Sequence, residues 1–155
     1  MKKFNCKCYD GTINEFIWNV TEGEYLIPDQ SSLPVVEYTI RSTISTLGGT
    51  FTIQVLEYDT EIKILHQSRD FMPSVTGKGI TAGMLIELFS IYNGKAIISS
   101  SRKPTDILGE SRSADMEKVY KGLAAAEIVR YNNIRDVFIY TKEDHEHNLK
   151  TLIQS

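Results

Sequence analysis

The chain has little cysteine, no long apolar run and no excess of positive charge, and each shortage excludes a class of protein. Its only cysteines, Cys6 and Cys8, are one residue apart, where a disulfide would be strained and a metal site would need further ligands. We therefore expect reduced, structural thiols and no metal. No apolar run approaches the roughly 20 residues of a membrane span. The net charge of −3 argues against nucleic acid as a partner.

The two ends of the chain carry little pattern. Lys2 and Lys3 are soon followed by Asn5, Cys6, Lys7 and Cys8 rather than by an apolar stretch. We therefore expect no signal peptide and, by default, a cytoplasmic protein without a membrane segment. The length fits one domain over 1–155. Residues 142–155 form a charged tail that we expect to be mobile or weakly helical. Residues 1–33 are poorly readable, and one set there has the spacing of a short helix face: Ile13, Phe16, Ile17 and Val20.

Between residues 36 and 66, apolar and polar residues alternate, as they do in half-buried strands. Turn residues such as Gly48-Gly49 and Asp59 separate the alternating stretches, so we expect an antiparallel meander. The predicted inward-facing residues are Val36, Tyr38 and Ile40, then Phe51, Ile53 and Val55, and finally Ile62, Ile64 and His66.

After residue 77 the period of the apolar residues changes from 2 to 3.6, which predicts a helix ended by Asn93-Gly94. A short strand over 95–99 then lies parallel to the strand before the helix, and a polar loop occupies 100–112. A second helix has Ser113 as its N-cap, and a hairpin over 129–140 follows. The two helices bury Ile80, Met84, Leu85, Leu88 and Ile91, and Met116, Val119, Tyr120 and Leu123.

This order of elements predicts an α+β (α/β) fold. The expected architecture is a mixed sheet with a central strand–glycine loop–helix–strand unit and flanking helices.

The segment from Phe71 to Leu85 is the most informative in the chain. It runs from a strand through Pro73 and a glycine-containing turn straight into an apolar helix. Glycines let the backbone turn tightly, and a helix start offers unpaired N–H groups and a positive dipole end. This combination predicts a site for a phosphate or pyrophosphate.

Two general phosphate-binding motifs fit this segment poorly. The nucleoside-triphosphate loop needs a glycine where Met72 stands and a Ser or Thr where Gly79 stands. The dinucleotide fingerprint matches at Gly77, Gly79 and Ala82. It also requires an acidic residue about 20 positions later, where this chain has serines.

Two segments resemble the GNAT superfamily of acetyl-CoA-dependent N-acetyltransferases. Residues 73–85, Pro-Ser-Val-Thr-Gly-Lys-Gly-Ile-Thr-Ala-Gly-Met-Leu, are similar to the pyrophosphate motif of that superfamily, with Thr76 in place of the usual Arg or Gln and Thr81 in place of a small residue. Residues 113–125 are similar to a second motif that contains a tyrosine, here Tyr120, with Ser113 in place of Asn.

The resemblance implies an acyltransferase that moves the acetyl group of acetyl-CoA, its cosubstrate, to an unknown amine, which is a small molecule or a protein. Tyr120 would protonate the departing thiolate, and a proton would leave the amine through water or a base such as Glu57, Glu61, His66 or Asp70. The resemblance also implies the cofactor-binding positions, mostly through their backbone amides: Phe71, Met72, Thr76, Gly77, Lys78, Gly79, Ile80, Thr81 and Ser113.

Two interpretations stay open at this point. The departures from the motifs also fit a catalytically silent protein that binds or inhibits a partner. Fold resemblance alone does not decide between these functions. The pair His145 and His147 does not form the H-E-x-x-H metal motif, so we interpret it as a solvated run on the charged tail.

Overall fold

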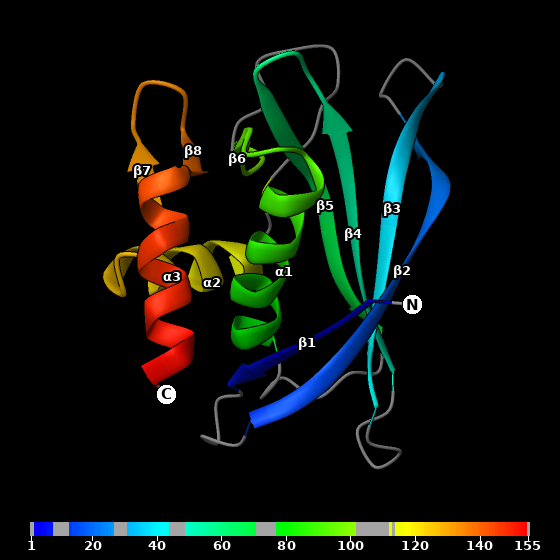
Figure 1. Ribbon diagram of the computed structural model, residues 1–155. Helices are drawn as coiled ribbons and strands as arrows, with labels where there is room; N and C mark the ends of the chain where they lie inside the picture. The colour runs from blue at the N-terminus through cyan, green and yellow to red at the C-terminus, as the bar shows by residue number, and fades with distance from the viewer. Residues whose placement is uncertain are drawn as a thin grey trace.

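The structure is a computed structural model that describes residues 2–7, 13–26, 31–43, 49–70, 77–101, 112 and 114–154. Within these residues, eight strands form one sheet in the order β1-β2-β3-β4-β5-β6-β8-β7, accompanied by three helices (Figure 1). The elements in chain order are β1 (Lys2–Lys7), β2 (Ile13–Leu26), β3 (Ser32–Ser42), β4 (Thr50–Glu57), β5 (Glu61–Asp70), α1 (Gly77–Ile91), β6 (Ala96–Ile98), α2 (Ala114–Ala125), β7 (Arg130–Asn132), β8 (Val137–Tyr140) and α3 (Lys142–Gln154).

The predicted meander is confirmed. Strands β3, β4 and β5 pair antiparallel, and the chain turns between β4 and β5 at residues 58–60. The closing hairpin β7–β8 is also present. β5 and β6 pair parallel, as predicted, with α1 connecting them. Asn93 and Gly94, at φ of 57° and 80°, end α1 in the left-handed conformation that such residues tolerate.

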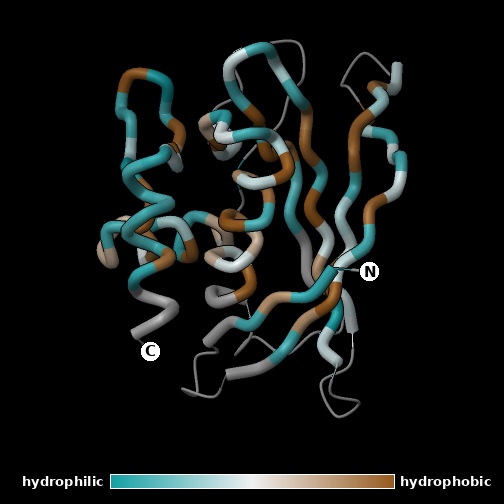
Figure 2. The backbone as a smooth tube through the Cα atoms, in the orientation of Figure 1, coloured by the Kyte–Doolittle hydropathy of each residue, from teal (hydrophilic) through white to brown (hydrophobic). Residues whose placement is uncertain are grey.

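One face of the sheet forms the main core together with α1 and α2. Alternating strand residues such as Ile40, Ile53 and Ile62 are fully buried in it and belong to the same cluster as Met84 and Leu88 of α1. A smaller cluster, centred on Val35 and Leu65, is built from strand residues only. The alternation of hydrophobic and hydrophilic residues that underlies these faces is visible as changing colour along the strands in Figure 2. No helix in the described part of the chain is long and apolar enough to cross a membrane.

The predicted fold class, a GNAT-like α/β arrangement with flanking helices, is wrong. The sheet dominates the molecule, with eight strands against three helices in the described residues. Two of these strands, β1 and β2, come from the N-terminal region that had no readable pattern. The predicted glycine loop is also displaced, since Gly77 and Gly79 lie in the first turn of α1 rather than before it.

The short helix predicted around Ile13–Val20 is a strand. β2 runs for 14 residues and pairs with β1 on one side and β3 on the other. Phe16 and Trp18 point into the core at the two-residue spacing of a strand, and Val20 is half exposed. Cross-strand pairing on both sides therefore overrides the helical spacing of the apolar residues.

The charged tail, which we expected to be mobile or weakly helical, is helix α3, and it packs on α1. Figure 2 shows that α3 is mostly hydrophilic, which is why its sequence resembles a solvated segment. Its contacts with the core are polar: Asn148 is 1% exposed, and its Nδ2 donates to the Ala82 carbonyl of α1 at 3.1 Å. His145 is only partly exposed, and its ring stacks on Phe89 with centroids 4.2 Å apart.

Candidate functional site

The parallel strands β5 and β6 separate after three residue pairs. Pairing ends at Lys63 and Ile98, whereas β5 continues to Asp70. Beyond Lys63, the edge of β5 that faces β6 has no strand partner in the described part of the sheet. The Ser100 hydroxyl closes the start of the gap, with Oγ 2.7 Å from the Ile64 carbonyl oxygen and 3.0 Å from that of Leu65.

A β-bulge lies in β5 at the same level. Ile64 pairs with Val55 of β4, but the next pair along β4 joins Gln54 to His66, so Leu65 is an extra residue. A bulge bends a strand and redirects the side chains that follow it. The predicted inward residue His66 is therefore exposed, and Gln67, opposite the core residue Ile53, takes the inward position.

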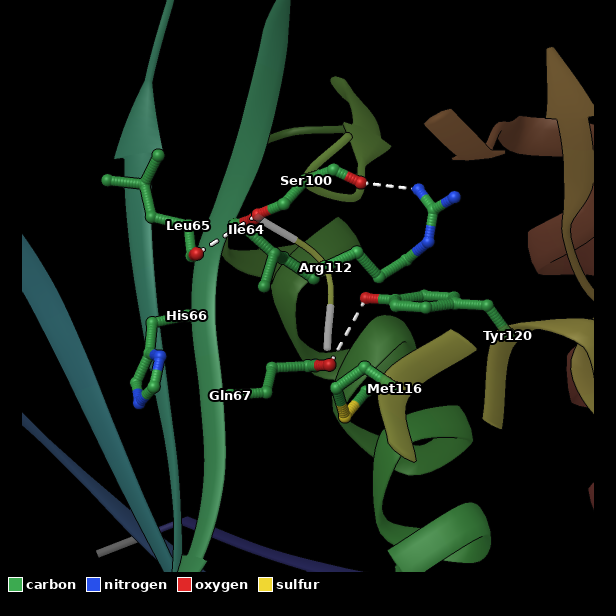
Figure 3. A pocket seen from close by; sticks show the side chains of 8 residues that line it. All are labelled: Ile64, Leu65, His66, Gln67, Ser100, Arg112, Met116 and Tyr120. Carbon is green, nitrogen blue, oxygen red and sulfur yellow. Dashed lines mark hydrogen bonds between the residues drawn. The ribbon is translucent and has the colours of Figure 1, made fainter. Parts of the chain in front are cut away.

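A pocket of about 140 Å³ opens beside this bulge (Figure 3). In Figure 3, the side chains of Gln67 and Tyr120 point toward one another across the pocket, and the Arg112 guanidinium is directed at Ser100. Leu65 and His66 point away on the other side of β5. The lining residues come from β5, from the segment after β6 and from the start of α2: Ile64, Leu65, His66, Gln67, Ser100, Arg112, Met116 and Tyr120.

Tyr120 is held firmly at the wall of this pocket. Its ring stacks on Phe138 at 5.3 Å with an interplanar angle of 13°, and the residue is 3% exposed. Its hydroxyl donates to Gln67 Oε1 at 3.3 Å. Burial raises the pKa of Tyr120 above its ordinary value, while the Arg112 charge and the Gln67 hydrogen bond act in the opposite direction. The phenol is therefore a protonated donor at neutral pH.

Arg112 is a buried cation whose charge is neutralised by two carboxylates. Its side chain is 1% exposed and pairs with Glu117 of α2 through Nε, and with Asp136 through Nη2 at 3.1 Å. Nη1 donates to the carbonyls of Ser100 at 2.5 Å and Asp136 at 3.0 Å. The guanidinium also lies 4.9 Å from the centre of the Phe138 ring. These bonds fix the segment after β6, the start of α2 and the β7–β8 turn around the pocket.

Among the predicted site residues that the structure describes, Tyr120 is the one that lines the pocket. Gly77, Lys78 and Gly79 form the first turn of α1, which contains no acidic residue, so its exposed N–H groups and dipole are not neutralised from within that turn. Ile80 and Thr81 follow in the same helix with side chains buried in the core. The remaining predicted positions, Phe71, Met72, Thr76 and Ser113, lie outside the described residues.

The four predicted bases also lie in different places relative to the pocket. Glu57 pairs with Lys95, and Glu61 forms two hydrogen bonds with Arg135, which lower the pKa of its carboxyl. Among the three bases whose side chains are described, His66 is the one at the pocket, but its side chain points away from Tyr120 on the other side of β5 (Figure 3). The side chain of Asp70 lies outside the described part of the chain.

Sequence reasoning missed Gln67 and Arg112. Gln67 reaches the pocket because the bulge at Leu65 shifts the alternation by one residue, and the regular pattern of Ile62 and Ile64 contains no sign of that shift. Arg112 stands in a stretch that reads as a polar loop, where a cation is usually solvated. A signal for a buried role was the position of Glu117 five residues later, at the start of the predicted helix.

Comparison of the chain with known protein families, with curated proteins and with solved structures finds no match. The interpretation of the site therefore depends on its own geometry and on the two motif-like segments.

Proposed function

We propose that the protein transfers the acetyl group of acetyl-CoA to an amine, at the pocket between β5 and α2. The observation that carries the proposal is the opening between the parallel strands β5 and β6, with a buried, protonated tyrosine on its wall. Three features of the opening support it, and each matches a different part of the thioester substrate.

The edge of β5 that faces β6 would form backbone hydrogen bonds with the pantetheine arm. Beyond Lys63, this edge offers backbone N–H and C=O groups that no described strand pairs on the β6 side. Pantetheine is an extended chain with two amides, so it can add to such an edge as a further strand would. The apolar side chains of Ile64 and Met116 line the same space.

The N-terminus of α1 would bind the pyrophosphate of coenzyme A. β5 runs toward the end of the molecule at which α1 begins (Figure 1). A 15-residue helix without an acidic first turn is a suitable anion site, and Gly79 there lets a phosphate approach the backbone closely. The predicted contacts of Gly77, Lys78 and Gly79 thus remain part of the proposal.

The Tyr120 hydroxyl would donate a hydrogen bond to the sulfur of the thioester. The amine nitrogen attacks the thioester carbon, the carbonyl oxygen gains negative charge, and the C–S bond then breaks to release a thiolate; the amine loses one proton to water or a base. Because its raised pKa makes the phenol a weaker acid than a thiol, Tyr120 stabilises the thiolate as a hydrogen-bond donor, and the final proton comes from solvent.

A second function, a silent binding protein, is favoured by one observation. The Tyr120 hydroxyl already has a partner in Gln67, and Arg112 is fully engaged with carboxylates, as they would be in a purely structural network. The test must therefore separate binding from turnover.

The test compares the wild type with Tyr120→Phe, which removes one hydroxyl and keeps the stacked ring. We expect calorimetry to give the same acetyl-CoA affinity for both proteins, and release of free coenzyme A in the presence of a panel of amines to fall roughly 100-fold or more in the variant. The melting temperature should fall only slightly, since one hydrogen bond contributes about 1 kcal/mol.

Three other outcomes are informative. An equal rate in both proteins would remove Tyr120 from the mechanism. Binding without acylation of any amine by the wild type would favour the silent binding protein. No heat of binding and no thermal shift at millimolar acetyl-CoA would exclude the acetyltransferase function at this pocket.

A further inference from the structure

Gln67 contains an unused hydrogen-bond donor inside the pocket. Its Oε1 accepts the Tyr120 hydroxyl, but its Nε2 is buried and has no partner in the described structure. A buried donor without an acceptor is costly, so such groups are rare, and a functional role is one of their known explanations. The ligand that completes this site must supply an acceptor at Nε2.

We propose that Gln67 Nε2 donates a hydrogen bond to the acyl carbonyl oxygen of the thioester, and so acts as the donor for the oxyanion. The inference rests on the proposed function, because it names the group that recognises the acyl half of the same substrate. Nothing in the motif-like segments points to this residue, which lies before both of them.

The arrangement of the donors suits a thioester. Both ends of the Gln67 carboxamide lie beside the Tyr120 hydroxyl, which is 3.3 Å from Oε1. A thioester places its oxygen and its sulfur on one carbon, so two neighbouring donors can meet them together. Gln67 Nε2 would meet the oxygen, and Tyr120 would turn its proton from Gln67 Oε1 to the sulfur as the C–S bond breaks.

The surroundings hold Gln67 in position for this role. It follows the bulge at Leu65, and its backbone is paired with Ile53 in the centre of the sheet. The strand therefore fixes the start of the side chain, and the Tyr120 hydrogen bond orients its end. A donor fixed before the substrate arrives needs no reorganisation when charge develops on the oxygen.

The first test needs no variant. Calorimetry compares acetyl-CoA with its S-ethyl thioether, which has a CH₂ group in place of the carbonyl. If Gln67 binds the carbonyl, the wild type should bind acetyl-CoA about tenfold more tightly than the thioether, the usual effect of one well-placed hydrogen bond.

The second test uses Gln67→Met, which has a similar length but no donor. The affinity ratio of the two ligands should fall close to one, with thioether affinity unchanged, and kcat for amine acylation should fall roughly 100-fold. Gln54→Met is the matched control, because Gln54 lies on the neighbouring strand β4 and its side chain bonds Glu37 and the Glu24 carbonyl instead of the pocket. This control should keep both the ratio and kcat.

The outcomes separate the two proposals. Equal wild-type affinity for both ligands would overturn the role of Gln67 and leave the acetyltransferase proposal standing. Binding of neither ligand would overturn both. If Gln67→Met does not fold, Gln67→Glu keeps the size and places a carboxylate against the carbonyl oxygen, and an unchanged ratio in that variant would again contradict the role of Gln67.

Discussion

Single side chains decide the shape of the pocket, and Arg112 does so most directly. It is bonded to Ser100, Glu117 and Asp136, residues from three segments that are separate in the sequence. An unpaired buried guanidinium would be strongly unfavourable, and the two carboxylates compensate for its desolvation. The cluster therefore keeps α2, and with it Tyr120, at a fixed distance from β5.

Glu87 of α1 gives a prediction for pH dependence. Partial burial raises the pKa of its carboxyl, an effect that the Trp18 indole and the Lys2 charge only partly offset. A raised pKa means that the folded protein binds the proton more tightly than the unfolded chain does. Glu87 therefore lowers stability as pH rises from its unfolded value, about 4.5, through its folded value.

Glu87→Gln removes this penalty. We expect a higher melting temperature than that of the wild type at pH 7–8, with the difference shrinking toward zero near pH 4, where the wild-type carboxyl is protonated. Thermal unfolding at several pH values measures it, and Glu22→Gln on the exposed part of β2 controls for the change of net charge. A difference that stays constant from pH 4 to pH 8 would contradict the assignment.

At the scale of elements, the outcome of prediction depended on where the stabilising contacts are made. β3, β4 and β5 were predictable because their residues alternate regularly, and α1 was predictable from its apolar positions and its Asn-Gly end. β2 was not, because its second half is rich in Thr, Glu and Gly. Its first half is stabilised by pairing with both β1 and β3, and its second half by pairing with β3. In the site, Tyr120 was predictable from a local motif, whereas Gln67 lies 53 residues from its partner.

α3 provides the clearest prediction at this scale. Asn148 donates to the Ala82 carbonyl and to the Tyr140 hydroxyl at 3.2 Å, and that hydroxyl in turn lies 2.9 Å from Nδ1 of His145. The Tyr140 hydroxyl therefore accepts from Asn148 and shares a further hydrogen bond with the His145 ring. This chain connects α3 to α1 and β8 at the point where the helix is buried.

Asn148→Ala removes two hydrogen bonds and leaves a small cavity. We expect a loss of about 2 kcal/mol in the free energy of unfolding, measured as a lower midpoint in urea with an unchanged m-value. Lys150→Ala, on the exposed side of the same helix, should change the midpoint little. Equal midpoints for Asn148→Ala and the wild type would indicate that α3 is not a cooperative part of the fold.

At the scale of the whole molecule, the sheet is continuous from β1 to β7, so the pocket lies within the structure that carries global stability. β4 and β5 lie in the middle of the strand order, and the core residues Ile53 and Ile62 on them are fully buried. Their backbone amides should exchange with solvent only when the whole domain unfolds. The edge strands β1 and β7 should exchange faster through local opening.

The difference in amide exchange between the central and the edge strands allows a test of how ligand binding affects stability. A ligand that binds only the folded state adds RT ln(1 + [L]/Kd), so acetyl-CoA at 100 times its Kd stabilises the protein by about 2.7 kcal/mol and slows exchange through global unfolding about 100-fold. We expect that slowing for the amides of β4 and β5, and a smaller effect in β1. Hydrogen exchange with and without acetyl-CoA measures it, and coenzyme A without the acetyl group shows which part of the effect the thioester contributes. Slowing confined to the β6-facing edge of β5 would mean that the core opens without releasing the ligand. No slowing anywhere would mean that acetyl-CoA does not bind the folded protein.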